Sequence, residues 1–171
     1  MSVDRTTVDL AAYPDLVVIY LGMRVNTLRG LRTLRRVGKE IARAVAAGPE
    51  GLLRHEMLWY SLVPPHGGMR QYWRDFDSLE RWARSLPHAE WWRRFVRDPG
   101  GTGFWHEAYF IRGGMEAIYD DVPGPLGFRA FAPVLPARGD LFSARRRAGL
   151  GGPEHLAPAV PESELGGSAP T

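Results

Sequence analysis

The chain is 171 residues long, which is enough for one domain with a hydrophobic core of its own. It contains no cysteine, so disulfide bonds, thiolate metal sites and cysteine nucleophiles are excluded together. The formal net charge is only +3, and the arginines are spread over several segments, whereas a nucleic-acid-binding protein concentrates them in one patch. We therefore expect no nucleic-acid partner.

The sequence also predicts no contact with a membrane. The longest apolar run, residues 16–23, is too short to cross a bilayer. The first ten residues lack the charged-then-apolar pattern of a signal peptide. We expect a cytoplasmic protein without a membrane partner.

The first third of the chain predicts an arm, a strand and a helix. Residues 1–14 are polar, which is typical of a loose N-terminal arm, and residues 16–25 are β-branched and apolar, which predicts a central strand. A helix then begins at Asn26 or Thr27, either of which can cap it through its side chain, and ends at Gly48-Pro49. Its apolar residues recur every three or four positions: Leu31, Leu34, Val37, Ile41 and Val45.

The next segments predict two strands, two helical pieces and a last strand. The expected elements are, in order, a strand over 52–62, a hairpin turn over 64–68, a strand over 69–74, a helix from Asp75 or Asp77 to residue 86, a short helix over 90–96, and a strand over 104–112.

The order strand, helix, strand, strand, helix, strand is that of a ferredoxin-like α+β domain, here spanning residues 15–120. Right-handed crossovers place the helices on one face of an antiparallel-type sheet with strand order 4-1-3-2. Apolar residues alternate onto the other, bare face, and such a face needs a partner. We therefore expect a homodimer that packs sheet against sheet as a dimeric α/β barrel.

The composition changes after residue 120. Eight prolines and eight glycines fall in residues 121–171. Residues 121–144 still hold large apolar side chains, so we expect an extended segment that wraps the domain or its partner. Residues 145–171 hold too few to offset the entropy of ordering, which predicts a disordered tail.

The strongest candidate site lies at residues 104–109 of the last strand. Alternation puts His106 on one face, and Glu107 with Trp105 and Tyr109 on the other. His106 suits a pocket base or an axial haem ligand, but equally a core histidine bonded to a backbone carbonyl. Glu107 suits a buried general acid or base, or an ion pair with an arginine.

Two further sets of side chains are candidates for a ligand pocket. Gln71, Tyr72 and Trp73 lie on a strand predicted to be central in the sheet, where Gln71 can accept a hydrogen bond from the indole N–H of Trp73 or orient a ligand. Ordinary packing is the alternative. Trp82 and Trp92 lie in the second helical region, where aromatic residues form a wall for a flat apolar ligand or fill the core.

No metal site is expected, although a second His-Glu pair, His55-Glu56, precedes the one at His106. In the strand order 4-1-3-2, His55 and His106 lie on opposite edges of the sheet, about 14 Å apart at about 4.8 Å per strand. One ion cannot bridge them within a subunit.

The segments at residues 17–26, 71–84, 88–95 and 103–124 resemble the DUF4188 proteins, also called the monooxygenase af470-like family, within the dimeric α/β barrel superfamily. This resemblance implies a ferredoxin-like dimer with a pocket between sheet and helices, and a role in secondary metabolism or small-molecule oxidation. The superfamily includes cofactor-independent monooxygenases and haem proteins such as aldoxime dehydratases. The resemblance implies these pocket residues: Trp105, His106, Glu107, Gln71, Tyr72 and Trp73.

Three functions are therefore open. The first is a monooxygenase-like oxidoreductase for an aromatic or polyketide-type substrate, in which His106 takes a proton from a phenol and Gln71 and Trp73 orient it. The second is a haem enzyme of the dehydratase or peroxidase type, with His106 as the axial ligand. The third is a non-catalytic protein that binds a small hydrophobic molecule. The cofactor is haem or none.

Overall fold

The structure is a computed structural model that describes residues 3–111, 115–120, 124–125, 127–148 and 162. By its internal contacts the chain divides into two units. One is Asp15–Phe110, and the other combines Met1–Pro14 with Ile111–Thr171. Each unit is described by itself.

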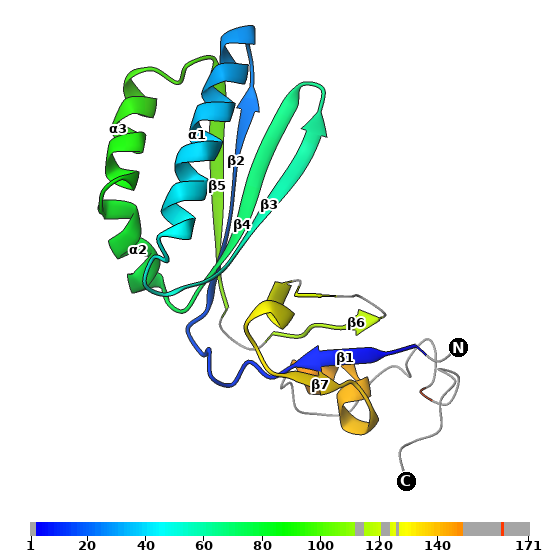
Figure 1. The fold of residues 1–171 in the computed structure, drawn as a ribbon. Helices are drawn as coiled ribbons and strands as arrows, with labels where there is room; N and C mark the ends of the chain where they lie inside the picture. The colour runs from blue at the N-terminus through cyan, green and yellow to red at the C-terminus, as the bar shows by residue number, and fades with distance from the viewer. Residues whose placement is uncertain (1–2, 112–114, 121–123, 126, 149–161, 163–171) are drawn as a thin grey trace. The chain divides into compact units, whose positions relative to one another are not determined.

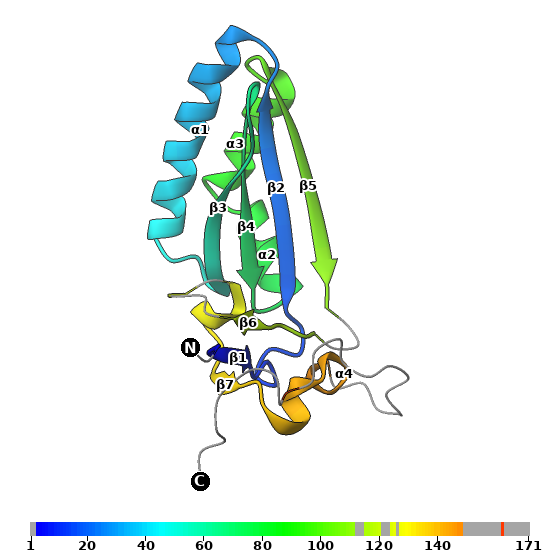
Figure 2. The ribbon, with the colours of Figure 1, turned by 90° about the vertical axis from the view of Figure 1, so that its right-hand side faces the viewer.

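The unit Asp15–Phe110 is a four-stranded sheet with three helices over one of its faces (Figures 1 and 2). Its elements are β2 (Val17–Val25), α1 (Leu28–Ala46), β3 (Leu52–Leu62), β4 (Pro65–Trp73), α2 (Phe76–Arg84), α3 (His88–Arg97) and β5 (Thr102–Phe110). All strand pairs are antiparallel, and the order is β3-β4-β2-β5. This order is the predicted 4-1-3-2 read from the other end, so the ferredoxin-like fold class is confirmed.

The hairpin between β3 and β4 differs from the prediction. Residues 66–68, expected in the turn, lie within β4, where Gly68 pairs with Gly22 of β2. A side chain at Gly68 would collide with the ring of Tyr60 and the backbone carbonyl of Leu21. Gly68 is therefore needed for a close approach across the sheet rather than for a turn.

The start of α1 is held by a distant backbone group. Thr27 is the N-cap, as expected, but its side chain makes no capping hydrogen bond. Instead the carbonyl of Gly101 accepts hydrogen bonds from the backbone N–H groups of Asn26 (2.9 Å) and Thr27 (3.1 Å). The prediction of a side-chain cap was wrong, because the N–H of Gly30, which such a cap can bind, donates to the backbone carbonyl of Thr27 at 2.8 Å instead.

The start of α2 follows the expected local chemistry. The carboxylate of Asp75 accepts a hydrogen bond of 2.7 Å from the backbone N–H of Ser78, as an N-cap does. Hydrogen bonds from the hydroxyl and the N–H of Ser78 lower the pKa of Asp75 to about 2. The first turn of α2 is thus fixed at the point where β4 ends.

The core lies between the helices and the sheet. Val17, Trp73 and Leu79 are buried there, from β2, β4 and α2. Partly buried side chains packed against them are Ile19, Leu52 and Trp82.

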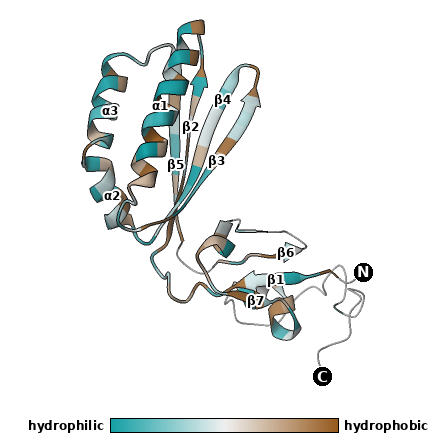
Figure 3. Cartoon of the chain, in the orientation of Figure 1, coloured by the Kyte–Doolittle hydropathy of each residue, from teal (hydrophilic) through white to brown (hydrophobic). Residues whose placement is uncertain are grey.

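The bare face of the sheet carries charge as well as aromatic rings. One row across the strands holds Glu56, Arg70, Tyr20 and Glu107, which are neighbours by register. Arg70 bonds to the carboxylate of Glu56 (2.6 Å) and to the hydroxyl of Tyr20 (3.1 Å). Figure 3 shows hydrophilic and hydrophobic residues together along β3 and β4. The expectation of a mainly apolar bare face was wrong, because charged side chains, Glu56, Arg70 and Glu107, lie on that face of β3, β4 and β5.

The second unit is built around a small sheet in the order β6-β1-β7. Its elements are β1 (Arg5–Val8), β6 (Tyr119–Asp120), 3₁₀ helices at Gly127–Ala130 and Gly139–Phe142, β7 (Val134–Pro136) and α4 (Ala144–Arg147). The ring of Tyr13 packs edge-on against Phe131 at 5.1 Å. The described segments before Asp15 and after Phe110 therefore pack together in one unit.

The predicted segment boundaries differ in part from this division. The start of the ferredoxin-like domain at residue 15 coincides with a unit boundary, whereas its end at residue 120 lies ten residues beyond Phe110. The expected arm, 1–14, holds a strand, and the expected wrapping segment, 121–144, belongs to the same unit as that strand. The expected disordered tail begins inside α4, and its residues 149–161 and 163–171 lie outside the described residues.

Candidate functional site

A pocket of about 640 Å³ lies within the unit Asp15–Phe110, between the helices and the sheet. This volume is within the range of sites for small molecules. Alternate residues of three strands face it: Ile19, Leu21 and Met23 of β2, Met69 and Gln71 of β4, and Phe104, His106 and Ala108 of β5. Charged side chains from the helical side also line it, among them Glu40, Arg84 and Arg93, but most of the surface of the pocket is apolar.

Aromatic rings form a continuous wall from α3 to β5. The ring of Trp92 lies 5.8 Å from that of Phe95 and 5.6 Å from that of Phe104, between ring centroids. Trp82 adds a further ring from α2 and lies 5.5 Å from buried Trp73. Trp92 is 49% exposed, so part of this wall remains accessible to solvent. Such a wall suits a flat apolar ligand.

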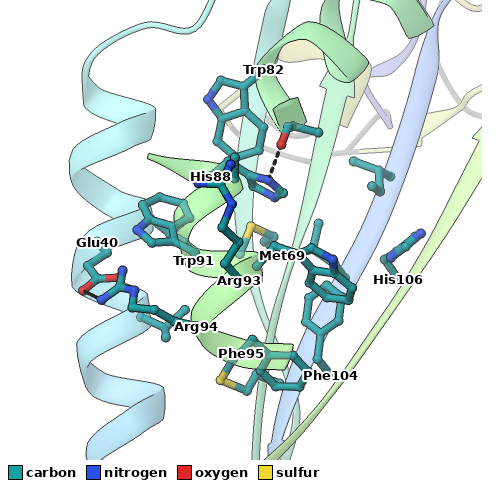
Figure 4. Close-up of a pocket in the computed structure, with 18 of the residues that line it drawn as sticks. Glu40, Met69, Trp82, His88, Trp91, Arg93, Arg94, Phe95, Phe104 and His106 are labelled. Carbon is teal, nitrogen blue, oxygen red and sulfur yellow. Dashed lines mark hydrogen bonds and ion pairs between the residues drawn. The ribbon is translucent and has the colours of Figure 1, made fainter. Parts of the chain in front are cut away.

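His88, the first residue of α3, is a pocket residue that the sequence analysis did not single out (Figure 4). Its Nδ1 lies 2.8 Å from the carbonyl oxygen of Ala83, and only a protonated Nδ1 can donate to a carbonyl. Burial lowers the pKa of His88, the Ala83 carbonyl raises it, and the charge of His106 lowers it further. His88 is therefore neutral at pH 7, with an unprotonated Nε2 on the ring edge away from Ala83.

His106 lies on the strand side of the same pocket, as Figure 4 shows. It belongs to β5, an edge strand, and pairs with Leu21 of β2. Its side chain is exposed, and its ring is 6.0 Å from that of Phe104. The pocket thus has one histidine on its helical side and one on its strand side.

The hydrogen bond between Trp73 and Gln71, one of the alternatives that the sequence left open, is present. The indole N–H of Trp73 donates to the amide oxygen of Gln71 at 3.1 Å. Gln71 lines the pocket, while Trp73 lies behind it in the core. The amide nitrogen of Gln71 lies 3.2 Å from Nδ1 of His55 on β3.

Four of the predicted site residues point to the other face of the sheet, because successive strand residues alternate: Tyr72, Trp105, Glu107 and Tyr109. There the hydroxyl of Tyr109 donates to Glu107 at 2.6 Å. The indole N–H of Trp105 donates to Nε2 of His66 at 2.8 Å. The structure therefore brings four predicted site residues together in the pocket: His106, Gln71, Trp82 and Trp92. It places the other four predicted site residues on the opposite face of the sheet.

Among the described residues, no group of three or more His, Asp or Glu side chains is placed to hold a metal ion. In the same part of the chain, no helix combines the length and the apolar character that a bilayer span requires.

The family model described as "Monooxygenase af470-like" matches residues 16–128. The chain belongs to the monooxygenase af470-like family. The matched region of this family member holds the whole pocket, since every residue lining it lies between Ile19 and Ala108.

An aliphatic aldoxime dehydratase from Rhodococcus erythropolis is 39% identical over 122 residues, which are 66% of this chain and 33% of that protein. An aldoxime dehydratase solved in complex with butyraldoxime superposes with a TM-score of 0.64 at 24% identity, covering 85% of this chain and 43% of that one. Another aldoxime dehydratase superposes with a TM-score of 0.60 at 20% identity, covering 78% of this chain and 39% of that one. This family member thus spans a third of the curated relative, and the structural matches show a shared fold.

Proposed function

We propose that the chain is a small-molecule enzyme of secondary metabolism that acts on an aromatic or polyketide-type substrate by monooxygenase-like chemistry. The observation that carries this proposal is the apolar, aromatic-walled pocket with one histidine on each side. A mostly apolar cavity with few polar groups is what a flat hydrophobic substrate needs.

The two histidines supply the acid–base chemistry. His88 offers an unprotonated Nε2, and His106 on the strand side can take a proton from a phenolic hydroxyl. The electron-rich phenolate then reacts with O₂. Atoms balance when a methylene of the substrate becomes a carbonyl, because one oxygen atom enters the product and the other leaves as water.

Anthrone, a tricyclic aromatic compound with such a methylene, is a suitable probe. We expect oxygen uptake with the unmodified protein, and a loss of about 100-fold or more in His106→Ala, the size of a general-base contribution. His88→Ala tests whether His88, on the helical side of the pocket, is the general base instead. Arg97→Ala, on α3 outside the pocket, is the control. Unchanged uptake in both histidine variants would contradict the mechanism, and binding of anthrone without oxygen uptake would favour the non-catalytic binding protein.

A second candidate is a haem enzyme of the dehydratase or peroxidase type, favoured by the hydrogen bond of His88. A ligating histidine usually donates its other ring N–H to a carbonyl or carboxylate, as Nδ1 of His88 does to Ala83. The aromatic walls also fit a flat macrocycle. His88 would hold the iron through Nε2, and His106 is the alternative ligand from the strand side. A bound haem would supply an iron that binds and polarises a substrate atom.

Haemin titration separates the two candidates. A haem protein takes up haemin and develops a shifted Soret band, and loss of that shift in His88→Ala or in His106→Ala identifies the ligand. A protein that takes up no haemin excludes this candidate.

We further propose that the chain forms a homodimer through the bare face of the sheet. Exposed rings and charged side chains lie together there, including Tyr109 and Glu107. Trp105, Glu107 and Tyr109 then belong to the contact between subunits rather than to the pocket of their own subunit, whereas Tyr72, at 3% exposed, is buried within its own chain.

A further inference from the structure

The amide of Gln71 is held between two fixed partners. Gln71 is 1% exposed and is one of the residues that line the pocket. Its oxygen lies 3.1 Å from the indole nitrogen of Trp73, and its nitrogen lies 3.2 Å from Nδ1 of His55. The register places His55 directly opposite Gln71 on the neighbouring strand.

The chemistry of these groups fixes the direction of both bonds. An indole N–H can only donate, so the oxygen of Gln71 is the end that faces Trp73. The amide nitrogen can only donate as well, so Nδ1 of His55 is the acceptor and carries no proton. His55 is then neutral, with its proton on Nε2.

The surroundings of His55 agree with this tautomer. Burial lowers the pKa of His55, the charge of Arg54 lowers it further, and Glu56 raises it. A protonated Nδ1 would face the amide N–H of Gln71, and one of the two donors would lose its partner. The neutral ring is thus the form that keeps the amide in place.

We propose that His55 is a positioning residue that fixes the Gln71 amide, so that Gln71 binds the hydrogen-bonding group, a hydroxyl or carbonyl, of an otherwise apolar ligand. Within the described chain, one N–H and one lone pair of this amide have no protein partner. This inference rests on the proposed function, namely that the pocket holds a small hydrophobic molecule. It adds that the ligand's polar group lies over β4, and that a residue outside the pocket controls its binding.

The tautomer can be measured without a ligand. In long-range ¹H–¹⁵N spectra at neutral pH, we expect Nδ1 of His55 to be unprotonated and Nε2 to be protonated. His55→Asn should keep the Trp73 indole signal in place, because the asparagine oxygen replaces Nδ1 as acceptor. His55→Leu should shift that signal. A protonated Nδ1, or an unchanged indole signal in His55→Leu, would overturn the proposal.

A matched pair of probes measures the effect on binding. Calorimetric titration compares 2-naphthol with 2-methylnaphthalene, which has a methyl group in place of the hydroxyl. We expect 2-naphthol to bind about 2- to 10-fold more tightly, as one net hydrogen bond implies. Gln71→Leu and His55→Leu should lose this preference and His55→Asn should keep it, while the affinity for 2-methylnaphthalene stays within about 2-fold.

The outcomes separate this inference from the proposed function. If both probes bind but His55→Leu keeps the preference for 2-naphthol, or the unmodified protein shows no such preference, the inference is wrong. The proposal of a pocket for small hydrophobic molecules is then not contradicted. If neither probe binds, both proposals fail. Should His55→Leu not fold, His55→Gln replaces it, because its longer side chain puts the amide near Nε2 rather than Nδ1.

Discussion

His88 and His55 are partly buried histidines whose pKa values are lowered, in both cases chiefly by burial. Each is neutral in the folded protein, whereas in the unfolded chain it titrates near its ordinary value of 6.5. Between that value and the lower folded pKa, the unfolded state binds more protons than the folded state. The free energy of unfolding therefore falls as the pH drops below about 6.5.

This behaviour gives a prediction for His88. In urea unfolding at about pH 7.5 and about pH 5.5, the unmodified protein should lose stability on acidification. His88→Asn should lose less, because its side-chain N–H can still donate to the Ala83 carbonyl but has no proton to gain. An equal loss in both proteins would mean that His88 does not titrate in this range.

At the scale of the element, α1 contains two glycines in different surroundings. Gly30 is buried where α1 meets the loop before β5, and a Cβ there would collide with the carbonyl oxygen of Gly101. That carbonyl also holds the start of α1. A Cβ at Gly38 would meet nothing within 4 Å.

The two glycines form a matched pair of variants. Gly38→Ala should stabilise the protein by about 0.5–1 kcal/mol, because alanine has the higher helix propensity. Gly30→Ala should destabilise it by about 1 kcal/mol or more, since the collision with backbone outweighs the same gain in propensity. Denaturant unfolding measures both. A stabilised Gly30→Ala would show that the approach of Gly101 to the helix is not rigid.

At the scale of the whole molecule, the proposed homodimer depends on the bare face of the sheet. Tyr109 is 50% exposed on this face and its ring lies 5.7 Å from that of Tyr20. We expect a dimer in sedimentation equilibrium at micromolar concentration. Tyr109→Lys should weaken it by about 10-fold or more, because a charge would be buried at the contact.

Leu28→Lys is the matched control for this test, because Leu28 is 86% exposed on α1, away from the sheet face. It should leave the dimer unchanged. A stable monomer of the unmodified chain at these concentrations would contradict the barrel arrangement.

The sequence predicted the fold through its periodicity. The alternation in β2 and β5 and the three-and-four spacing in α1 depend on near neighbours, and they indicated the element order and the face of each strand residue. The strand order then followed from the rule of right-handed crossovers. The Trp73–Gln71 bond was among the alternatives that this alternation offered, since the two residues are two positions apart on one strand.

The tertiary structure decided what depends on residues far apart in the chain. The carbonyl that holds α1 comes from Gly101, some seventy positions later, and the partner of Gln71 comes from His55 on another strand. His88 was overlooked because the second helical piece was predicted to begin at residue 90, whereas it begins at His88. Periodicity places a residue on a face, but which faces meet around a pocket follows only from the packing of helices on the sheet.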